Sequence, residues 1–236
     1  MNTALPIVFL PGLVCDAAVW APQLAALGRT ATVVHYGCAN TLAGMARIAL
    51  AAAPPGRFAL AGHSMGGRVA FEMLRLASER IERVALLDTG CAPLPAGEAG
   101  ERERVFRMGL LATARRDGMR VMAAEWARGM VHASRIGGPV FEAVLEMFER
   151  RDAETFEAQL QALLARPDAT PLLPTIGCPA LLLTGAQDDW SPPAAHRAMH
   201  ESVPGSRLVV VPDCGHMSTI EAPAAVNSAL AAWLAA

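Results

Sequence analysis

The sequence contains no lysine, and all 20 of its basic residues are arginines. This absence excludes chemistry that needs a lysine side chain, such as Schiff-base catalysis, a serine–lysine dyad or phosphate binding by a P-loop lysine. Charge is also scarce, because charged residues make up 18% of the chain and the formal net charge is −2. Without a strong field of either sign, the chain is not expected to bind nucleic acid or an anionic membrane surface.

Cysteine is sparse and widely spaced. The five cysteines are Cys15, Cys38, Cys91, Cys178 and Cys214. Their odd number and the lack of a C-x-x-C pair argue against a disulfide framework, a zinc site and a redox pair. No phosphate-binding glycine loop is present either. We therefore expect no metal, no cofactor and a reduced, cytoplasmic environment.

Long hydrophobic runs are missing, although apolar residues make up 53% of the chain. No run approaches the roughly 18 residues that a membrane-spanning helix needs. The N-terminal stretch MNTALPIVFLPG has no basic region, and Pro6 and Pro11 break its apolar run. It is therefore expected to form a strand rather than a signal peptide. The 236 residues are enough for one domain, 1–236, with a large core.

Six short apolar runs, each closed by glycine, proline or aspartate, predict strands. They lie near 5–12, 31–37, 57–64, 83–90, 179–185 and 207–213. Their nearly continuous apolar character is typical of parallel strands that are covered on both faces. Helical patterns lie between them, at 40–53, 66–79, 192–202 and 221–235. The alternation predicts an α/β fold with a mostly parallel central sheet flanked by helices.

The alternation stops after the fourth run. Between about 96 and 166 the chain has charged, methionine-rich helical patterns and no strand-like run. Those patterns lie at 98–116, 118–131, 138–150 and 152–165. We expect a helical cap inserted into a core formed by about 1–95 and 167–236, covering a site at the carboxyl ends of the strands. The alternative is that these helices pack as one more layer of core.

The stretch FALAGHSMGGRVAFEML, residues 58–74, contains the pattern G-x-S-x-G around Ser64. An apolar strand precedes the serine and an amphipathic helical pattern follows it. Such a sharp strand-to-helix turn crowds its neighbours, and glycines at Gly62 and Gly66 relieve the crowding. The turn presents Ser64 beside a helix N-terminus, where backbone amides favour developing negative charge. Ser64 is therefore the candidate nucleophile.

A serine hydroxyl needs a base to take its proton, and without lysine the best candidate is histidine. The histidines are His35, His63, His132, His196, His200 and His216. His216 follows the last predicted strand in a glycine-containing loop, which places it near the other strand ends. His63 adjoins Ser64, but neighbouring side chains on such a corner diverge. His216 is therefore the preferred base.

The base in turn needs a carboxylate that holds its tautomer and stabilises the imidazolium. Asp188 follows a strand as a loop residue and is preferred. Two alternatives remain. Asp88 lies at the end of an earlier strand, and Asp189 directly follows Asp188 in the same loop. Asp213 is too close in sequence to His216 to be an easy partner.

The stretches GHSMGG, TGAQDDWSPP and PDCGHMSTIEAP, in this order, resemble the α/β-hydrolase family. The resemblance covers essentially the whole chain and implies Ser64 as nucleophile, Asp188 as acid and His216 as base. The backbone N–H of Met65, directly after the nucleophile, is the first expected oxyanion donor. VFLPGLVCDAAVW resembles the family's oxyanion loop and implies Leu13 as the second, although Pro-Gly stands here where members often have His-Gly.

Apolar residues of the insertion are candidates for an acyl pocket, foremost Trp126 and Met130 as substrate-binding residues. Ordinary core packing is the alternative for these two and for Met108, Phe141 and Met147. We expect Trp190 to serve packing and Arg68 to be structural or solvated. His196 and His200, one helical turn apart, are expected to be solvated.

The resemblance implies a serine hydrolase that cleaves a small carboxylic ester through an acyl-enzyme, with a small-molecule ester as its partner. The same residues also serve thioesterases, acyltransferases, perhydrolases, C–C hydrolases and lyases, because the fold does not fix the reaction. A protein of another class, a non-catalytic module that holds a ligand under the cap, is a further alternative.

Overall fold

The computed structural model describes residues 5–236, and Met1–Ala4, the start of the N-terminal stretch predicted as a strand, lie outside the described residues. At its centre is a six-stranded sheet with the order β2-β1-β3-β4-β5-β6, in which every neighbouring pair is parallel. The strands are β1 (Ile7–Leu10), β2 (Ala31–Val33), β3 (Phe58–His63), β4 (Ile81–Leu87), β5 (Ala180–Gly185) and β6 (Arg207–Val211). Each of the six apolar runs overlaps one strand, and β4 begins two residues before its run, so the predicted fold class is confirmed.

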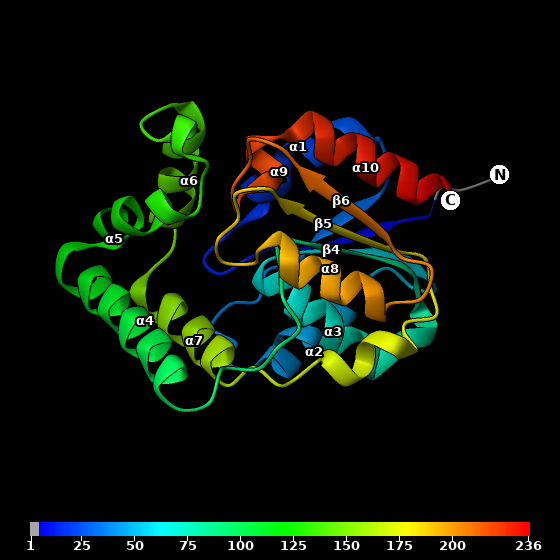
Figure 1. Ribbon diagram of the computed structural model, residues 1–236, viewed down its shortest axis with the longest axis horizontal. Helices are drawn as coiled ribbons and strands as arrows, with labels where there is room; N and C mark the ends of the chain where they lie inside the picture. Colours follow the sequence, from blue (N-terminus) through cyan, green and yellow to red (C-terminus); the bar gives the residue numbers. More distant parts are fainter. Residues whose placement is uncertain (1–4) are drawn as a thin grey trace.

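Helices cover both faces of the sheet, which explains why the strand sequences do not alternate. One side carries α1 and α10, and the other carries α2, α3 and α8 (Figure 1). Their bounds are α1 (Ala21–Leu27), α2 (Leu42–Ala52), α3 (Met65–Ala77), α8 (Pro193–Ser202), α9 (Ser218–Glu221) and α10 (Pro223–Ala235). The inner strands β1, β3 and β5 are buried along their whole length. The sequence patterns predicted neither α1 nor the short α9.

Four helices lie between β4 and β5, to one side of the sheet (Figure 1). They are α4 (Glu98–Asp117), α5 (Met119–Trp126), α6 (Pro139–Glu149) and α7 (Ala153–Leu164). Gly118 separates α4 from α5 with a φ of 92°, a backbone conformation that favours glycine. The Asp152 carboxylate caps α7 by accepting a 2.7 Å hydrogen bond from the N–H of Thr155.

Short 3₁₀ helices complete the connections. They are η1 (Ala17–Trp20), η2 (Ser78–Arg80), η3 (Ala127–Gly129), η4 (Ala133–Arg135) and η5 (Thr170–Thr175). Within residues 5–236, no helix combines the length and the apolar character that crossing a membrane requires. Because all strands run in the same direction, the loops after β3, β4, β5 and β6 meet at one edge of the sheet.

Candidate active site

The corner between β3 and α3 is tight and strained. Ser64 stands between the last residue of β3 and the first of α3, with φ 53° and ψ −117°. A side chain on Gly62 would overlap the backbone carbonyl of Gly66, and one on Gly66 would overlap the carbonyl of Leu10. Both glycines are therefore needed for the close approach that brings Ser64 to the sheet edge.

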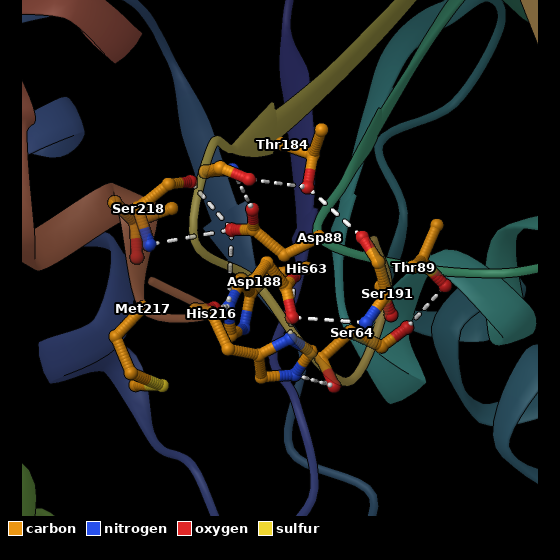
Figure 2. Close-up of polar contacts among 12 residues, drawn as sticks. His63, Ser64, Asp88, Thr89, Thr184, Asp188, Ser191, His216, Met217 and Ser218 are labelled. Carbon is orange, nitrogen blue, oxygen red and sulfur yellow. Dashed lines mark hydrogen bonds and ion pairs between the residues drawn. The ribbon is translucent and has the colours of Figure 1, made fainter. Parts of the chain in front are cut away.

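His216 brings Ser64 and Asp188 together through the two nitrogens of its ring (Figure 2). Its Nε2 lies 2.8 Å from Oγ of Ser64, and its Nδ1 lies 2.8 Å from Oδ2 of Asp188. Asp188 and His216 are buried, while Ser64 is partly exposed. The geometry fits a neutral imidazole whose Nδ1–H donates to the carboxylate and whose Nε2 accepts from the serine hydroxyl.

The Asp188 carboxylate is held by its own loop. Its Oδ1 accepts hydrogen bonds of 2.9 Å from the backbone N–H groups of Trp190 and Ser191. Burial alone would raise the pKa of Asp188, but the charge of His216 and these hydrogen bonds outweigh it, and the pKa is lowered. Burial likewise acts to lower the pKa of His216, and the Asp188 carboxylate overcomes this and raises it. The raised pKa makes the neutral imidazole a stronger acceptor for the serine proton, as a general base needs.

The loop that carries His216 is fixed by the segment that follows α5. The N–H of His216 donates a 2.5 Å hydrogen bond to the carbonyl of Met130. Glu221 accepts from the N–H of Gly215 at 3.1 Å and from the N–H of His132 at 2.7 Å. The position of the imidazole thus depends on contacts with the helical segment, and sequence patterns did not indicate this role of Glu221.

Asp88, the alternative acid, lies behind the His216 loop and does not bond the imidazole. Its carboxylate accepts from the N–H of Gly185 at 3.2 Å and from the N–H and hydroxyl of Ser218 (Figure 2). Burial raises the pKa of Asp88 well above its ordinary value. His63 lies 3.5 Å away, and its Nε2 donates to the carbonyl of His216 at 2.9 Å. Burial lowers the pKa of His63 to about 3, so this ring is neutral.

The two expected oxyanion donors line the same cavity as Ser64. Leu13 follows β1 and Met65 begins α3. Within residues 5–236, neither backbone N–H donates a hydrogen bond to another group. Both are therefore available to an oxygen that gains charge beside Ser64.

This cavity has a volume of about 380 Å³ and lies between the strand ends and the helical segment. Trp126 and Met130, the expected substrate-binding residues, both line it. Trp190 lines it as well, with its ring 5.3 Å from that of Trp126 and 5.8 Å from that of His216. Trp190 packs as expected, and its ring also forms part of the cavity wall.

The expectations for the two histidines of α8 need correction. His196 is fully buried rather than solvated, and its Nε2 accepts a hydrogen bond from the N–H of Thr89, just after β4. His200 is partly buried and its Nδ1 lies 2.8 Å from the hydroxyl of Ser206. Arg68 lines the cavity, and its position four residues after Ser64, on the same helix face, was a usable signal.

Comparison with known proteins identifies the family to which this fold belongs. Residues 7–229 match the model of the alpha/beta hydrolase family. The chain belongs to this family. The chain is therefore an enzyme with hydrolase activity, as predicted.

Similar proteins differ in their reactions. The putative carbamate hydrolase RutD of Klebsiella pneumoniae is 27% identical over 98% of this chain and 92% of its own length. A pimeloyl-[acyl-carrier protein] methyl ester esterase of Nitrosomonas europaea is 28% identical over 72% of this chain and 68% of its own.

Solved structures of similar fold also include hydrolases with different names. A thermophilic esterase from Thermogutta terrifontis, solved with malate bound, superposes with a TM-score of 0.87 at 29% identity, covering all of this chain and 91% of that chain. An enol-lactonase from Burkholderia xenovorans LB400 has a TM-score of 0.83 at 26% identity, covering all of this chain and 93% of that chain. The names of these relatives refer to a carbamate, a methyl ester, an ester and an enol-lactone, and they do not fix the substrate of this hydrolase.

Proposed function

We propose that this hydrolase cleaves small carboxylic esters through an acyl-enzyme formed on Ser64. The observation that carries the proposal is the single imidazole of His216, with 2.8 Å contacts to Ser64 on one side and to Asp188 on the other. A hydroxyl becomes a good nucleophile when such an oriented base accepts its proton. Esterases and an enol-lactonase among the relatives support the bond type.

In the proposed reaction, the Ser64 hydroxyl gives its proton to Nε2 of His216 as Oγ attacks the ester carbonyl. The carbonyl oxygen becomes negative and accepts hydrogen bonds from the N–H groups of Leu13 and Met65. Each such donor contributes about 2.7–4 kcal/mol to lowering the barrier. Asp188 stabilises the imidazolium formed in this step.

Collapse of the tetrahedral intermediate breaks the bond to the alcohol, and His216 protonates the departing oxygen. Water then attacks the Ser64 ester while the same imidazole takes its proton, and the acid leaves as Oγ regains a hydrogen. We further propose that residues 96–166 act as a cap, which holds the acyl group against Trp126 and Met130 and limits the access of water.

A fluorophosphonate probe, which reacts with activated serines, tests the proposal on the full chain. We expect labelling at Ser64 and turnover of p-nitrophenyl acetate or butyrate, with both lost in Ser64→Ala. Ser202→Ala, which removes an exposed serine on α8, should label as the unaltered chain does. A folded chain that neither labels nor turns over any ester would overturn the proposal.

A further inference from the structure

Three arginines and one glutamate line the cavity that Ser64 and His216 share. They are Arg68, Glu103, Arg107 and Arg166. An apolar ester needs no such group of charges, and buried charges are costly unless they are paired. The proposed mechanism assigns a role to none of the four.

Glu103 neutralises only part of the positive charge of the three arginines. Its two oxygens accept from both terminal nitrogens of Arg166, at 2.8 and 2.7 Å, in the paired geometry that guanidinium and carboxylate favour. Arg107 donates its Nε–H to the same carboxylate at 2.8 Å. The side chains of Arg107 and Arg166 are only 13% and 7% exposed. One carboxylate thus serves two buried arginines.

Arg68 has no carboxylate partner among residues 5–236. One terminal nitrogen donates to the carbonyl of Ala92 at 2.8 Å, and the other lies against Gly90 at the cavity wall. Burial, and next the charge of Arg166, lowers the pKa of Arg68 to about 10, so the guanidinium stays charged at neutral pH. Its α-carbon lies in the first turn of α3, four residues after Ser64.

The charges therefore do not balance inside the cavity. Against three guanidinium groups stand Glu103 and, at the exposed edge, Asp189, which makes no ion pair among the described residues. A net positive, partly enclosed site attracts an anion, and a guanidinium with free N–H groups binds a carboxylate with directional hydrogen bonds.

We propose that Arg68, supported by the Glu103–Arg107–Arg166 group, binds a carboxylate of the substrate. The preferred substrates are then small esters that carry a free carboxylate on the acyl or the alcohol side. This inference rests on the proposed ester hydrolysis, because it assigns the substrate class of the same site. The apolar wall formed by Trp126 and Met130 would hold the carbon chain between the ester and the carboxylate.

The test compares charged esters with neutral esters of the same shape. Monomethyl succinate against methyl levulinate places the carboxylate on the acyl side, and acetoxyacetate against acetoxyacetone places it on the alcohol side. In one of the two pairs, kcat/KM for the charged member should exceed that of the neutral one by about tenfold or more, as hydrogen bonds to charged groups predict.

Variants of Arg68 test whether this preference for the charged ester depends on the Arg68 side chain. Arg68→Gln should lower the charged-to-neutral ratio by about tenfold, and Arg68→Lys should restore part of it. Arg120→Gln is the matched control, since Arg120 lies outside the cavity and pairs with Glu142 and Glu149 on the surface. Its ratio should equal that of the unaltered chain. Equal rates within both pairs would overturn the inference.

A binding measurement keeps the result independent of catalysis. Calorimetry on Ser64→Ala should detect succinate binding that weakens with added salt and falls about tenfold in Ser64→Ala/Arg68→Gln. If no ester is turned over, the proposed function fails, and the succinate titration still decides whether the arginines bind a carboxylate. Absence of succinate binding together with equal ester rates contradicts the carboxylate site alone.

Discussion

The Nδ1 atom of His216 lies 2.8 Å from Oδ2 of Asp188, although the two residues stand in loops after different strands, β5 and β6. The contact fixes the orientation of a ring whose other nitrogen faces Ser64. It also fixes the tautomer, because Nδ1 must carry the hydrogen that Asp188 accepts.

Asp188→Asn should therefore cost most of the ester turnover. An amide can present its NH₂ to Nδ1 and stabilise the wrong tautomer, and such a change lowers kcat by roughly 10⁴-fold in serine hydrolases. Steady-state kinetics on p-nitrophenyl butyrate measure the loss, and circular dichroism shows whether the variant is folded.

Asp88→Asn is the matched control, because it makes the same change in a buried carboxylate that does not contact the imidazole. We expect kcat to stay within about tenfold of the unaltered chain. Stability should fall by about 1–3 kcal/mol, since the new amide faces N–H donors of Gly185 and Ser218. If Asp88→Asn removed turnover and Asp188→Asn did not, the acid would be Asp88.

The pH profile should reflect the raised pKa of His216. The base must be neutral to accept the Ser64 proton, so activity is present above that pKa and is lost as pH falls through it. The midpoint of the acid limb of kcat/KM should lie above 6.5, the ordinary value for histidine. In Asp188→Asn, the residual activity should have a lower midpoint, because the carboxylate that raises the pKa is gone. A midpoint below 6.5 in the unaltered chain would contradict the assignment.

Most of the fold was readable from the sequence because parallel strands covered on both faces leave continuous apolar runs. The run RVALLDTG, for example, is buried at each of its four last strand positions, Val84–Leu87. Helix α1 was missed because APQLAAL is short, carries no charge and lacks a polar face. Such a segment gives no periodic signal and becomes helical through packing against α10.

The candidate site was predictable where chemistry and local geometry coincide, as at Ser64 between its glycines. The surroundings of the cavity were not. Arg107 reaches Glu103 as its neighbour one turn along α4, but Arg166 lies 63 residues after Glu103, and only the packing of α4 against the end of α7 brings it there. No local pattern separates these arginines from the many that lie in solvent, such as Arg102.

Gly66, the second residue of α3, should tolerate no side chain. In Gly66→Ala the new methyl group would overlap the carbonyl of Leu10, so either β1 or the corner must move. We expect a loss of about 1–3 kcal/mol or more in the free energy of unfolding, measured in urea.

Gly109→Ala is the control, since that glycine is exposed within α4 with open space around it. It should stabilise the chain by about 0.5–1 kcal/mol. Equal effects of the two changes would show that crowding does not explain the motif.

Trp126 should limit the length of the acyl group. Its ring lines the cavity between Trp190 and Phe148, and its buried indole N–H has no hydrogen-bond partner. Trp126→Phe removes that unpaired donor and shortens the side chain, so the fold should persist while the cavity deepens. One methylene in such a pocket is worth about 1–3 kcal/mol, so the hexanoate-to-butyrate ratio of kcat/KM should rise by at least about fivefold. Trp20→Phe makes the same change at another buried indole without a partner, packed on Phe9 outside the cavity, and should leave the ratio unchanged. If both variants gave the same chain-length profile as the unaltered hydrolase, Trp126 would be a packing residue and the acyl group would lie elsewhere in the cavity.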